Sequence, residues 1–403
     1  MTMDRRAFLL RSGLVGCSLA ASPLVTPVSF AAAPWEGRLV VIVLRGGMDG
    51  LDVLRPVGDP DFAALRDDQD RAAPHALDGF FALHPALSAL LPLWQAGEFG
   101  AVHAVSTPYR DRRSHFDGQD LLEAGTDAPN VARDGWLNRL LQAVPGIEGD
   151  TAYAIGRDEL KLLAGGAEVM RWAPEADLVL SPQALRLAEM VMQDDPAFAA
   201  AFAQARRLAA GGDEAPAMAA TPRQMAGQME DGMRAARGTA AHGNIARFAA
   251  DKLRGDARIA AFSLHGWDTH ERQDIALPRA LARLAETILA LREDLGPVWR
   301  QTAVLAMTEF GRTARLNGTR GTDHGTGGAM LLAGGALAGG RVWTDWPGLA
   351  EADLYQRRDL AATRDLRAYA AWAMRGLFGL DRTLLERTVF PGLEIGADPG
   401  LIL

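Results

Sequence analysis

Short apolar runs separated by amphipathic stretches make up most of the chain after residue 34. Five of these runs are apolar almost throughout, as in strands buried on both faces of a sheet, and they cover residues 38–44, 99–106, 258–264, 302–308 and 329–334. Apolar positions recur at helical spacing between them, which predicts helices over residues 85–96, 116–124, 277–295 and 363–378. Strands that alternate with helices predict an α/β fold with a mainly parallel central sheet covered on both faces.

The stretch from about residue 128 to residue 254 has a different character. It is rich in Ala, Met and Gln at helical spacing, so we expect a mostly helical insertion there. The rest of residues 34–403 shows no internal repeat and is expected to form one domain around that insertion. With 403 residues, of which 48% are hydrophobic, the chain has enough apolar material for a large core, and wholesale disorder is excluded.

The first 33 residues are expected to be an export signal. Arg5 and Arg6 form a twin-arginine pattern, and the apolar stretch over residues 14–30 contains two prolines before the chain reaches three alanines. We therefore expect the twin-arginine export machinery to carry the chain to the periplasm or out of the cell. The mature chain should contain no membrane segment. Cys17 leaves an alternative open, because residues 14–17 also look like the cleavage box of a lipoprotein.

Charge and cysteine content narrow the chemistry that the chain can perform. The formal net charge is -8 and there is no basic run, which argues against nucleic acid as a partner. Cys17 is the only cysteine of the sequence, so disulfides within the chain and thiolate metal clusters are excluded. Any bound metal must therefore be held by Asp, Glu and His.

Residues of that kind gather where the predicted strands end. Three clusters follow or precede apolar runs: His265-Gly-Trp-Asp268-Thr-His270, Glu309-Phe-Gly-Arg312, and Asp323-His324. Open α/β sheets bind ligands at the carboxyl ends of their strands, and carboxylates and imidazoles hold divalent ions such as zinc, manganese, magnesium and calcium. The expected metal ligands are Asp49, Asp268, His270, Glu309, Asp323 and His324. His265 and Arg312 are expected to bind the substrate. For each histidine taken alone, a structural role is the alternative.

The first apolar run leads into Leu44-Arg45-Gly-Gly47-Met-Asp49, whose glycine spacing does not match a dinucleotide-binding loop. Arg45 supplies a cation for an anionic substrate and is assigned to the catalytic group, while Asp49 is a candidate metal ligand. Two further histidines, His84 and His103, lie in apolar surroundings and are expected in the core.

Another candidate for catalysis lies at the start of the helix over residues 116–124. Ser114 and Asp117 have the spacing of a capping box. The Ser114 hydroxyl is also placed as a nucleophile, because the helix dipole and the Arg113 guanidinium would stabilise the oxyanions of a phosphoryl or sulfuryl group. The two roles are compatible, and His115 is assigned to the same catalytic group.

Together these motifs resemble a bacterial exported family known as domain of unknown function 1501. Besides the twin arginines, the resemblance rests on Leu44-Arg-Gly-Gly-Met-Asp-Gly-Leu-Asp52, Arg113-Ser-His-Phe-Asp117, His265-Gly-Trp-Asp-Thr-His270, Thr308-Glu-Phe-Gly-Arg-Thr313 and Gly321-Thr-Asp-His-Gly325. It spans nearly the whole chain. That family is in turn similar to the alkaline-phosphatase-like superfamily of phosphatases and sulfatases. The similarity implies a three-layer sandwich in which Ser114 matches the nucleophile, and Asp268, His270 and His324 match metal ligands.

Three departures from that superfamily leave the activity open, and one is that Asp268 and His270 lie closer together than usual. Arg45 stands where an acidic ligand usually ends the first strand, and Glu309-Phe310 stands where Asp-His usually follows a later one. One metal, or none with Arg45 in place of a cation, are both open. The leading expectation is an exported hydrolase of phosphate or sulfate esters that acts on an anionic small molecule or a glycan. The alternative is a non-catalytic periplasmic binding protein on the same fold.

Overall fold

The computed structural model describes residues 35–66, 73–110, 113–147, 149–173 and 240–403. The expected export signal and the alternative lipid site at Cys17 lie outside the described residues. So do residues 174–239 of the expected insertion.

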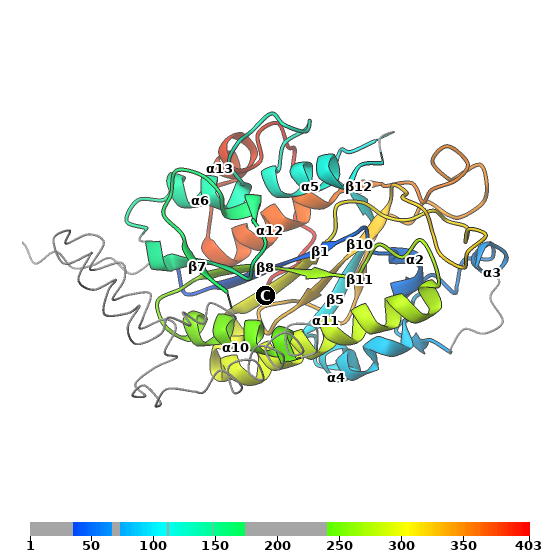
Figure 1. The fold of residues 1–403 in the computed structure, drawn as a ribbon, viewed down its shortest axis with the longest axis horizontal. Helices are drawn as coiled ribbons and strands as arrows, with labels where there is room; N and C mark the ends of the chain where they lie inside the picture. The colour runs from blue at the N-terminus through cyan, green and yellow to red at the C-terminus, as the bar shows by residue number, and fades with distance from the viewer. Residues whose placement is uncertain (1–34, 67–72, 111–112, 148, 174–239) are drawn as a thin grey trace, which may run out of the picture.

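A central sheet organises the described part of the chain (Figure 1). Its strands are β1 (Arg38–Arg45), β5 (Phe99–Ser106), β6 (Ala152–Ile155), β7 (Met170–Trp172), β8 (Ile259–His265), β9 (Thr302–Met307), β10 (Gly328–Ala333), β11 (Val342–Trp343) and β12 (Arg364–Asp365). They lie in the order β11-β5-β10-β9-β1-β8-β6-β7, with β12 also paired to β5. β10 runs antiparallel to β5 and β9, whereas the other recorded pairings of this sheet are parallel. The expected mainly parallel sheet is confirmed.

Helices cover both faces of this sheet, above and below it in Figure 1. One face carries α5 (His115–Ala124), α6 (Trp136–Ala143) and α12 (Leu366–Phe378), and the other carries the 3-10 helix η1 (Pro85–Leu90), α4 (Leu91–Gln95), α10 (Ala240–Arg254) and α11 (Gln273–Leu295). Side chains of β1 alternate between the two cores, since Val41 packs on the first face and Val40 and Ile42 on the second. The result is a three-layer α/β/α sandwich.

Each strand and helix expected from the periodicity is present, with two differences in detail. The helix expected over residues 85–96 is divided into η1 and α4, with Pro92 at the start of α4. Proline has no backbone N–H and cannot continue the hydrogen bonding of a preceding helix, which accounts for the break. β6 and β7 lie inside the range expected to be mostly helical, and they extend the main sheet beyond β8. They have four and three residues, too few to show a period of two.

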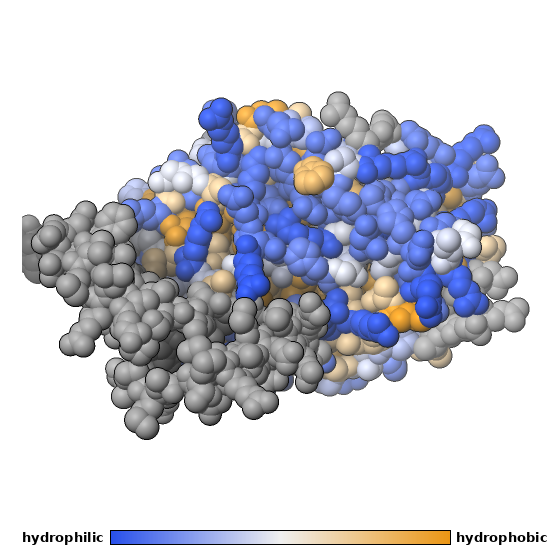
Figure 2. Space-filling view, in the orientation of Figure 1, coloured by the Kyte–Doolittle hydropathy of each residue, from blue (hydrophilic) through white to orange (hydrophobic). Residues whose placement is uncertain are grey.

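Shorter elements complete the described chain. They are α2 (Gly50–Val53), α3 (Phe62–Leu65), η2 (Gly149–Thr151), η3 (Lys161–Leu163), η4 (Gly296–Gln301), α13 (Arg382–Leu384), the π-helix η5 (Leu385–Val389), and a small sheet of β2 (Leu54–Arg55), β4 (Ala82–Leu83) and β3 (His75–Ala76). No helix among the described residues is long and apolar enough to cross a membrane. The face seen in Figure 2 is largely hydrophilic with scattered apolar side chains.

Candidate metal centre

The segments that carry the expected site residues meet at one edge of the main sheet. The parallel strands β1, β8 and β9 all end there, and the reversed strand β10 begins there. The loops after β8 and β9 therefore face the loop before β10, and the start of α5 joins them after β5. This is the edge at which open α/β sheets bind ligands.

Four side chains at this edge bring their ligand atoms close together. Oδ1 of Asp268 lies 3.0 Å from Nε2 of His270 and 3.3 Å from Nε2 of His324. Its Oδ2 lies 3.4 Å from Nε2 of His115, and the Nε2 atoms of His270 and His324 are 2.9 Å apart. Tetrahedral zinc with bonds of about 2.0–2.1 Å separates its ligand atoms by roughly 3.3–3.4 Å. The ligand atoms of His115, Asp268 and His324 all lie within 4.8 Å of one another, and their spacings of 3.3 and 3.4 Å to Asp268 fit a divalent cation. The shorter contacts of His270 place its ring at the border of this group.

The other ring nitrogen of each of these histidines contacts an oxygen acceptor. The acceptors of the Nδ1 atoms are Oε1 of Glu309 for His115 (2.8 Å), Oδ1 of Asp323 for His270 (3.2 Å) and the carbonyl oxygen of Arg113 for His324 (3.1 Å). Such contacts place the proton on Nδ1 and leave the Nε2 lone pair for a metal. Nε2 of His115 is buried and has no hydrogen-bond partner in the described part of the chain. A cation between these atoms would satisfy it, so the residues present fit a metal.

Arg312 holds Asp268 from the inner side of the site. Its guanidinium is 0% exposed, and Nη2 lies 2.5 Å from Oδ1 of Asp268. Its remaining bonds go to backbone carbonyls of three loops, at Gly46, Gly47, Trp267 and Thr322. Burial alone would raise the pKa of Asp268, but the Arg312 hydrogen bond and charge outweigh it and hold that pKa below its ordinary value. Arg312, expected to bind substrate, therefore orients Asp268 and shows no surface to solvent.

Glu309 lies behind His115 and does not face the gathered Nε2 atoms. Its Oε1 accepts hydrogen bonds from Nδ1 of His115, from Nε2 of Gln119 at 3.1 Å and from the backbone N–H of Gly46 at 2.9 Å. Burial would raise the pKa of Glu309, yet these bonds lower it below its ordinary value. The hydrogen bond to Glu309 in turn raises the pKa of His115. The expected metal ligand Glu309 is thus placed to orient another ligand.

The loop after β1 needs a glycine at position 46. Its φ is +126°, and a Cβ atom at this position would lie 2.4 Å from the backbone nitrogen of Asp268. The loops after β1 and β8 approach this closely because no side chain separates them.

Asp49, another expected metal ligand, lies in a buried ion pair away from the cluster. Both of its oxygens accept hydrogen bonds from Arg66, at 2.6 and 3.0 Å, and Nε2 of Gln273 donates to the same carboxylate at 2.7 Å. The carboxylate is 1% exposed. A buried carboxylate needs such partners to remain charged, so Asp49 stabilises the loop after β1.

Arg45 and His265 form a second polar group beside the cluster, at paired positions on β1 and β8. Arg45 binds Oε1 of Glu123 at 2.9 Å, Oε1 of Gln119 at 2.8 Å and Oγ of Ser263 at 2.9 Å. Nε2 of the exposed His265 lies 2.7 Å from Oδ2 of Asp158, which leaves the ring open to solvent. The structure does not place either residue among the gathered ligands.

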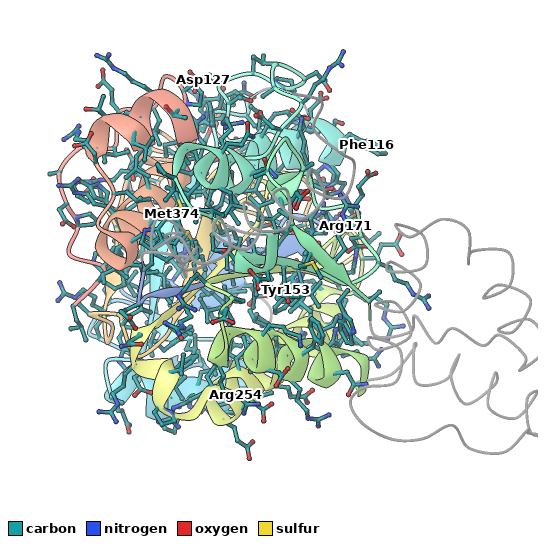
Figure 3. All side chains as sticks on the ribbon, turned by 90° about the vertical axis from the view of Figure 1, so that its left-hand side faces the viewer. Phe116, Asp127, Tyr153, Arg171, Arg254 and Met374 are labelled. Carbon is teal, nitrogen blue, oxygen red and sulfur yellow. The ribbon has the colours of Figure 1, made fainter. Side chains whose placement is uncertain are left out.

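Ser114 is the N-cap of α5. Its Oγ accepts a hydrogen bond from the backbone N–H of Asp117 at 3.4 Å, as the capping pattern predicts. Its own N–H donates to the Tyr109 hydroxyl at 2.7 Å. Phe116 is 89% exposed and projects outward from α5 (Figure 3), whereas its neighbour His115 contacts the cluster. A nucleophilic role of Ser114 stays a prediction.

Arg113 and His324 line a small pocket at the edge of the cluster. The Arg113 side chain is exposed, so its guanidinium is accessible to an anion at this position.

Three residues that shape the site were not predicted from the sequence. Gln119 and Glu123 follow His115 at intervals of four, which places all three on one face of α5. That spacing is visible in the sequence and is the sign that could have found them. Phe310 forms a wall, with its ring centroid 5.1 Å from that of His115 and 4.9 Å from that of His324.

Comparison with solved structures gives matches that share a TM-score of 0.34. The lipoteichoic acid synthase LtaP from Listeria monocytogenes is 8% identical, over 71% of this chain and 59% of that chain, so the match spans about three fifths of its length. The alkaline phosphatase from the Antarctic bacterium TAB5 is 10% identical, over 77% of this chain and 95% of that one. A protein in the alkaline phosphatase superfamily from Vibrio parahaemolyticus is 11% identical, over 83% and 69%. A search of curated proteins gave no match.

The family comparison covers most of the chain. Residues 98–374 match the family described as "Protein of unknown function (DUF1501)". This range includes His115, Asp268, His270 and His324, and therefore all the gathered ligand atoms. The chain belongs to the DUF1501 family, as its motifs predicted.

Proposed function

We propose that the protein is an exported, metal-dependent hydrolase of phosphate or sulfate esters. The observation that carries the proposal is the meeting of three imidazole Nε2 atoms with the Asp268 carboxylate, while each Nδ1 contacts an oxygen acceptor. Nitrogen ligands with one carboxylate are typical of zinc, and they also suit manganese. The exposed Arg113 beside His324 supports an anionic substrate, either a small molecule or a glycan.

Each part of the site has a role in this proposal. Asp268, His270, His324 and His115 would hold the metal, which when bound supplies Lewis-acid stabilisation of charge on a phosphoryl or sulfuryl oxygen. Arg113 would bind the non-bridging oxygens of the ester.

Ser114 is the proposed nucleophile, because its hydroxyl lies at the N-terminus of α5, where the helix dipole stabilises negative charge. Its Oγ would form a bond to phosphorus or sulfur as the bond from that atom to the ester oxygen breaks, and the proton of the serine hydroxyl would pass to the leaving oxygen. Water would then release the phosphate or sulfate and restore the hydroxyl.

Asp268 provides the direct test. Purified protein should bind about one equivalent of zinc or manganese and hydrolyse chromogenic phosphate or sulfate esters. Asp268→Asn should lower metal affinity and hydrolysis by at least about 100-fold, because it removes the charged ligand that all three imidazoles face. Asp398→Asn, an exposed aspartate in a loop, is the matched control and should change neither.

Two results would contradict the proposal. Absence of both metal binding and ester hydrolysis in the wild-type protein would remove its basis. Metal binding without hydrolysis of any ester in the panel would favour the non-catalytic binding protein.

Export by the twin-arginine machinery to the periplasm or cell exterior is part of the proposal. It is supported by Arg5 and Arg6 and by the apolar stretch that follows them. Replacing both arginines with lysine should leave the chain in the cytoplasm, as measured by cell fractionation. Cys17→Ser should leave the location of the exported chain unchanged, and loss of membrane attachment in this variant would instead identify a lipoprotein.

A further inference from the structure

Three side chains of α5 lie along one face of the helix and all join the network behind the metal centre. His115, Gln119 and Glu123 are four residues apart, which places them one above the other on the helix. His115 contacts Asp268 directly, whereas Gln119 and Glu123 contact groups farther from it. The face therefore continues from the cluster into the interior.

Gln119 connects two charged groups, and its amide can lie in only one orientation. Its Oε1 accepts a hydrogen bond from Nη1 of Arg45 at 2.8 Å, and its Nε2 donates to Oε1 of Glu309 at 3.1 Å. A guanidinium can only donate and a carboxylate can only accept, so a flipped amide would lose both bonds. Gln119 thereby holds the carboxylate that contacts Nδ1 of His115.

Arg45 is anchored at the other end of this chain of contacts. Its guanidinium pairs with Glu123 at 2.9 Å and donates to Ser263 at 2.9 Å, and the side chain is only 12% exposed. Glu123 is itself buried and accepts a bond from the backbone N–H of Leu162 at 3.1 Å. The charge of Arg45 is thus paired within the protein, and the orientation of its guanidinium is fixed before any substrate binds.

We propose that Gln119 and Arg45 are positioning residues of the metal centre, which fix the Glu309 carboxylate and through it the imidazole of His115. Arg45 acts through Gln119 and does not touch the substrate. The proposal rests on the proposed function in one respect, namely that His115 belongs to a metal site.

The physical reason lies in the bonds of one oxygen atom. Oε1 of Glu309 accepts three hydrogen bonds, from His115, Gln119 and Gly46. Oε2 of Glu309 contacts the Thr308 hydroxyl at 3.0 Å, so without the Gln119 bond the carboxylate would keep only the Gly46 and Thr308 contacts to hold it against His115. A carboxylate held by fewer bonds fixes Nδ1 of His115 less tightly. Metal sites lose affinity when the groups behind their ligands are removed, by about 10–100-fold for a direct contact.

Zinc and cobalt binding to the full mature chain tests this role. In competition with a chelating dye, Gln119→Leu should bind zinc about 10-fold more weakly than the wild-type protein. Gln119→Glu should lose at least as much, because it keeps an acceptor for Arg45 but sets a second carboxylate against Glu309. The visible absorption of bound cobalt should change in both variants, since it reports ligand geometry.

Gln142→Leu is the matched control. Gln142 is an exposed helical glutamine whose Nε2 donates to Oδ1 of Asn138 at 2.8 Å. This variant should bind zinc as the wild type does, within about twofold, whatever its effect on the free energy of unfolding. Zinc affinity and cobalt spectra equal to those of the wild type in both Gln119 variants would overturn the proposal. If Gln119→Leu does not fold, the result for Gln119→Glu decides.

A measurement on the metal-free protein separates this inference from the proposed function. The Nδ1 proton of His115, bonded to Glu309, should give a downfield proton resonance in nitrogen-15-labelled protein, identified by its absence in His115→Gln. Its loss or shift in Gln119→Leu supports the positioning role even if no ester is hydrolysed. An unchanged resonance in that variant contradicts the role even if metal binding and hydrolysis are found.

Discussion

His103 lies in the middle of β5 with no exposed surface, and its surroundings fix its protonation state. Its Nδ1 accepts a hydrogen bond from the N–H of Ala104 at 2.7 Å, and its Nε2 lies 3.1 Å from the carbonyl oxygen of Leu54. A neutral ring with its proton on Nε2 satisfies both contacts. Burial lowers the pKa of His103 from 6.5 to about 4, so the folded protein favours the neutral form. The sequence-based expectation of a core histidine is confirmed.

This shift predicts a loss of stability in acid. The unfolded chain takes up a proton at His103 near pH 6.5 and the folded chain only near pH 4. The full contribution of neutral His103 to the free energy of unfolding is therefore present above pH 6.5. It falls as the pH drops through this window, by about 3 kcal/mol in total. Urea unfolding at pH 7 and pH 4.5 should show the loss, and His103→Gln should lose correspondingly less over the same interval. Equal pH dependence in the two proteins would contradict the assignment.

Asp49 and Asp268 show which features of a site residue are absent from its local sequence. Both follow the end of a buried strand, and both were expected to bind metal. In the structure Asp49 meets Arg66, while Asp268 is 47% exposed and faces three imidazoles. The partner of Asp49 comes from the C-cap of α3, and no pattern in the sequence shows that the two would meet. Residue type and strand end predicted the place of Asp268, whereas tertiary contacts decided the role of Asp49.

At the scale of elements, the start of α5 brings two proposed roles of Ser114 together. The hydroxyl caps the helix, and it is also the proposed nucleophile. Ser114→Ala should lower the free energy of unfolding by about 1 kcal/mol and abolish ester hydrolysis. Ser114→Asp should keep the cap, because aspartate is an equally good N-cap, but should abolish hydrolysis. Urea unfolding and ester assays measure the two effects separately.

Ser114→Thr, which keeps a hydroxyl acceptor at the same position, is the control for both effects. It should retain most of the stability and part of the hydrolysis. Undiminished hydrolysis by the alanine variant would exclude Ser114 as the nucleophile and leave its capping role intact.

The main elements could be predicted because each is long enough to show a regular pattern of apolar positions. β1 and β9 are buried on both faces and read as continuous apolar runs, which fixed their places in a parallel sheet. β6 and β7 were missed because three or four residues show no period. The strand-end rule also gathered Asp268, His270 and His324 correctly at one edge. It could not show that Glu309 and Arg312 lie behind the ligands, because side-chain direction depends on loop conformations set by tertiary contacts.

At the scale of the whole molecule, the candidate metal centre joins parts of the chain that are far apart in sequence. His115, Asp268 and His324 come from the start of α5, the loop after β8 and the loop before β10. A metal that binds only when these parts are folded together stabilises the entire domain, by about 2.7 kcal/mol at a free concentration 100 times the dissociation constant. Removing it with a chelator should therefore lower the melting temperature by several degrees, and added zinc should restore it.

Calorimetry with and without chelator measures this effect. Asp268→Asn is the control, and its melting temperature should respond to neither chelator nor zinc. An equal response of the variant and the wild-type protein would show that the ion acts elsewhere.

The reversed direction of β10 has a consequence for the order in which the chain is assembled. The residues that follow a parallel strand lie at the ligand edge, whereas for β10 it is the preceding residues that lie there. The two strands next to β10 start at residues 99 and 302. His324 is held in place only when β10 lies between strands that are about 200 residues apart, and contacts so distant in sequence carry a large loop-closure entropy that slows folding. The rate at which the refolding chain binds the metal should therefore report the step in which β10 joins the sheet. A chain truncated before β10 should bind no metal at this site.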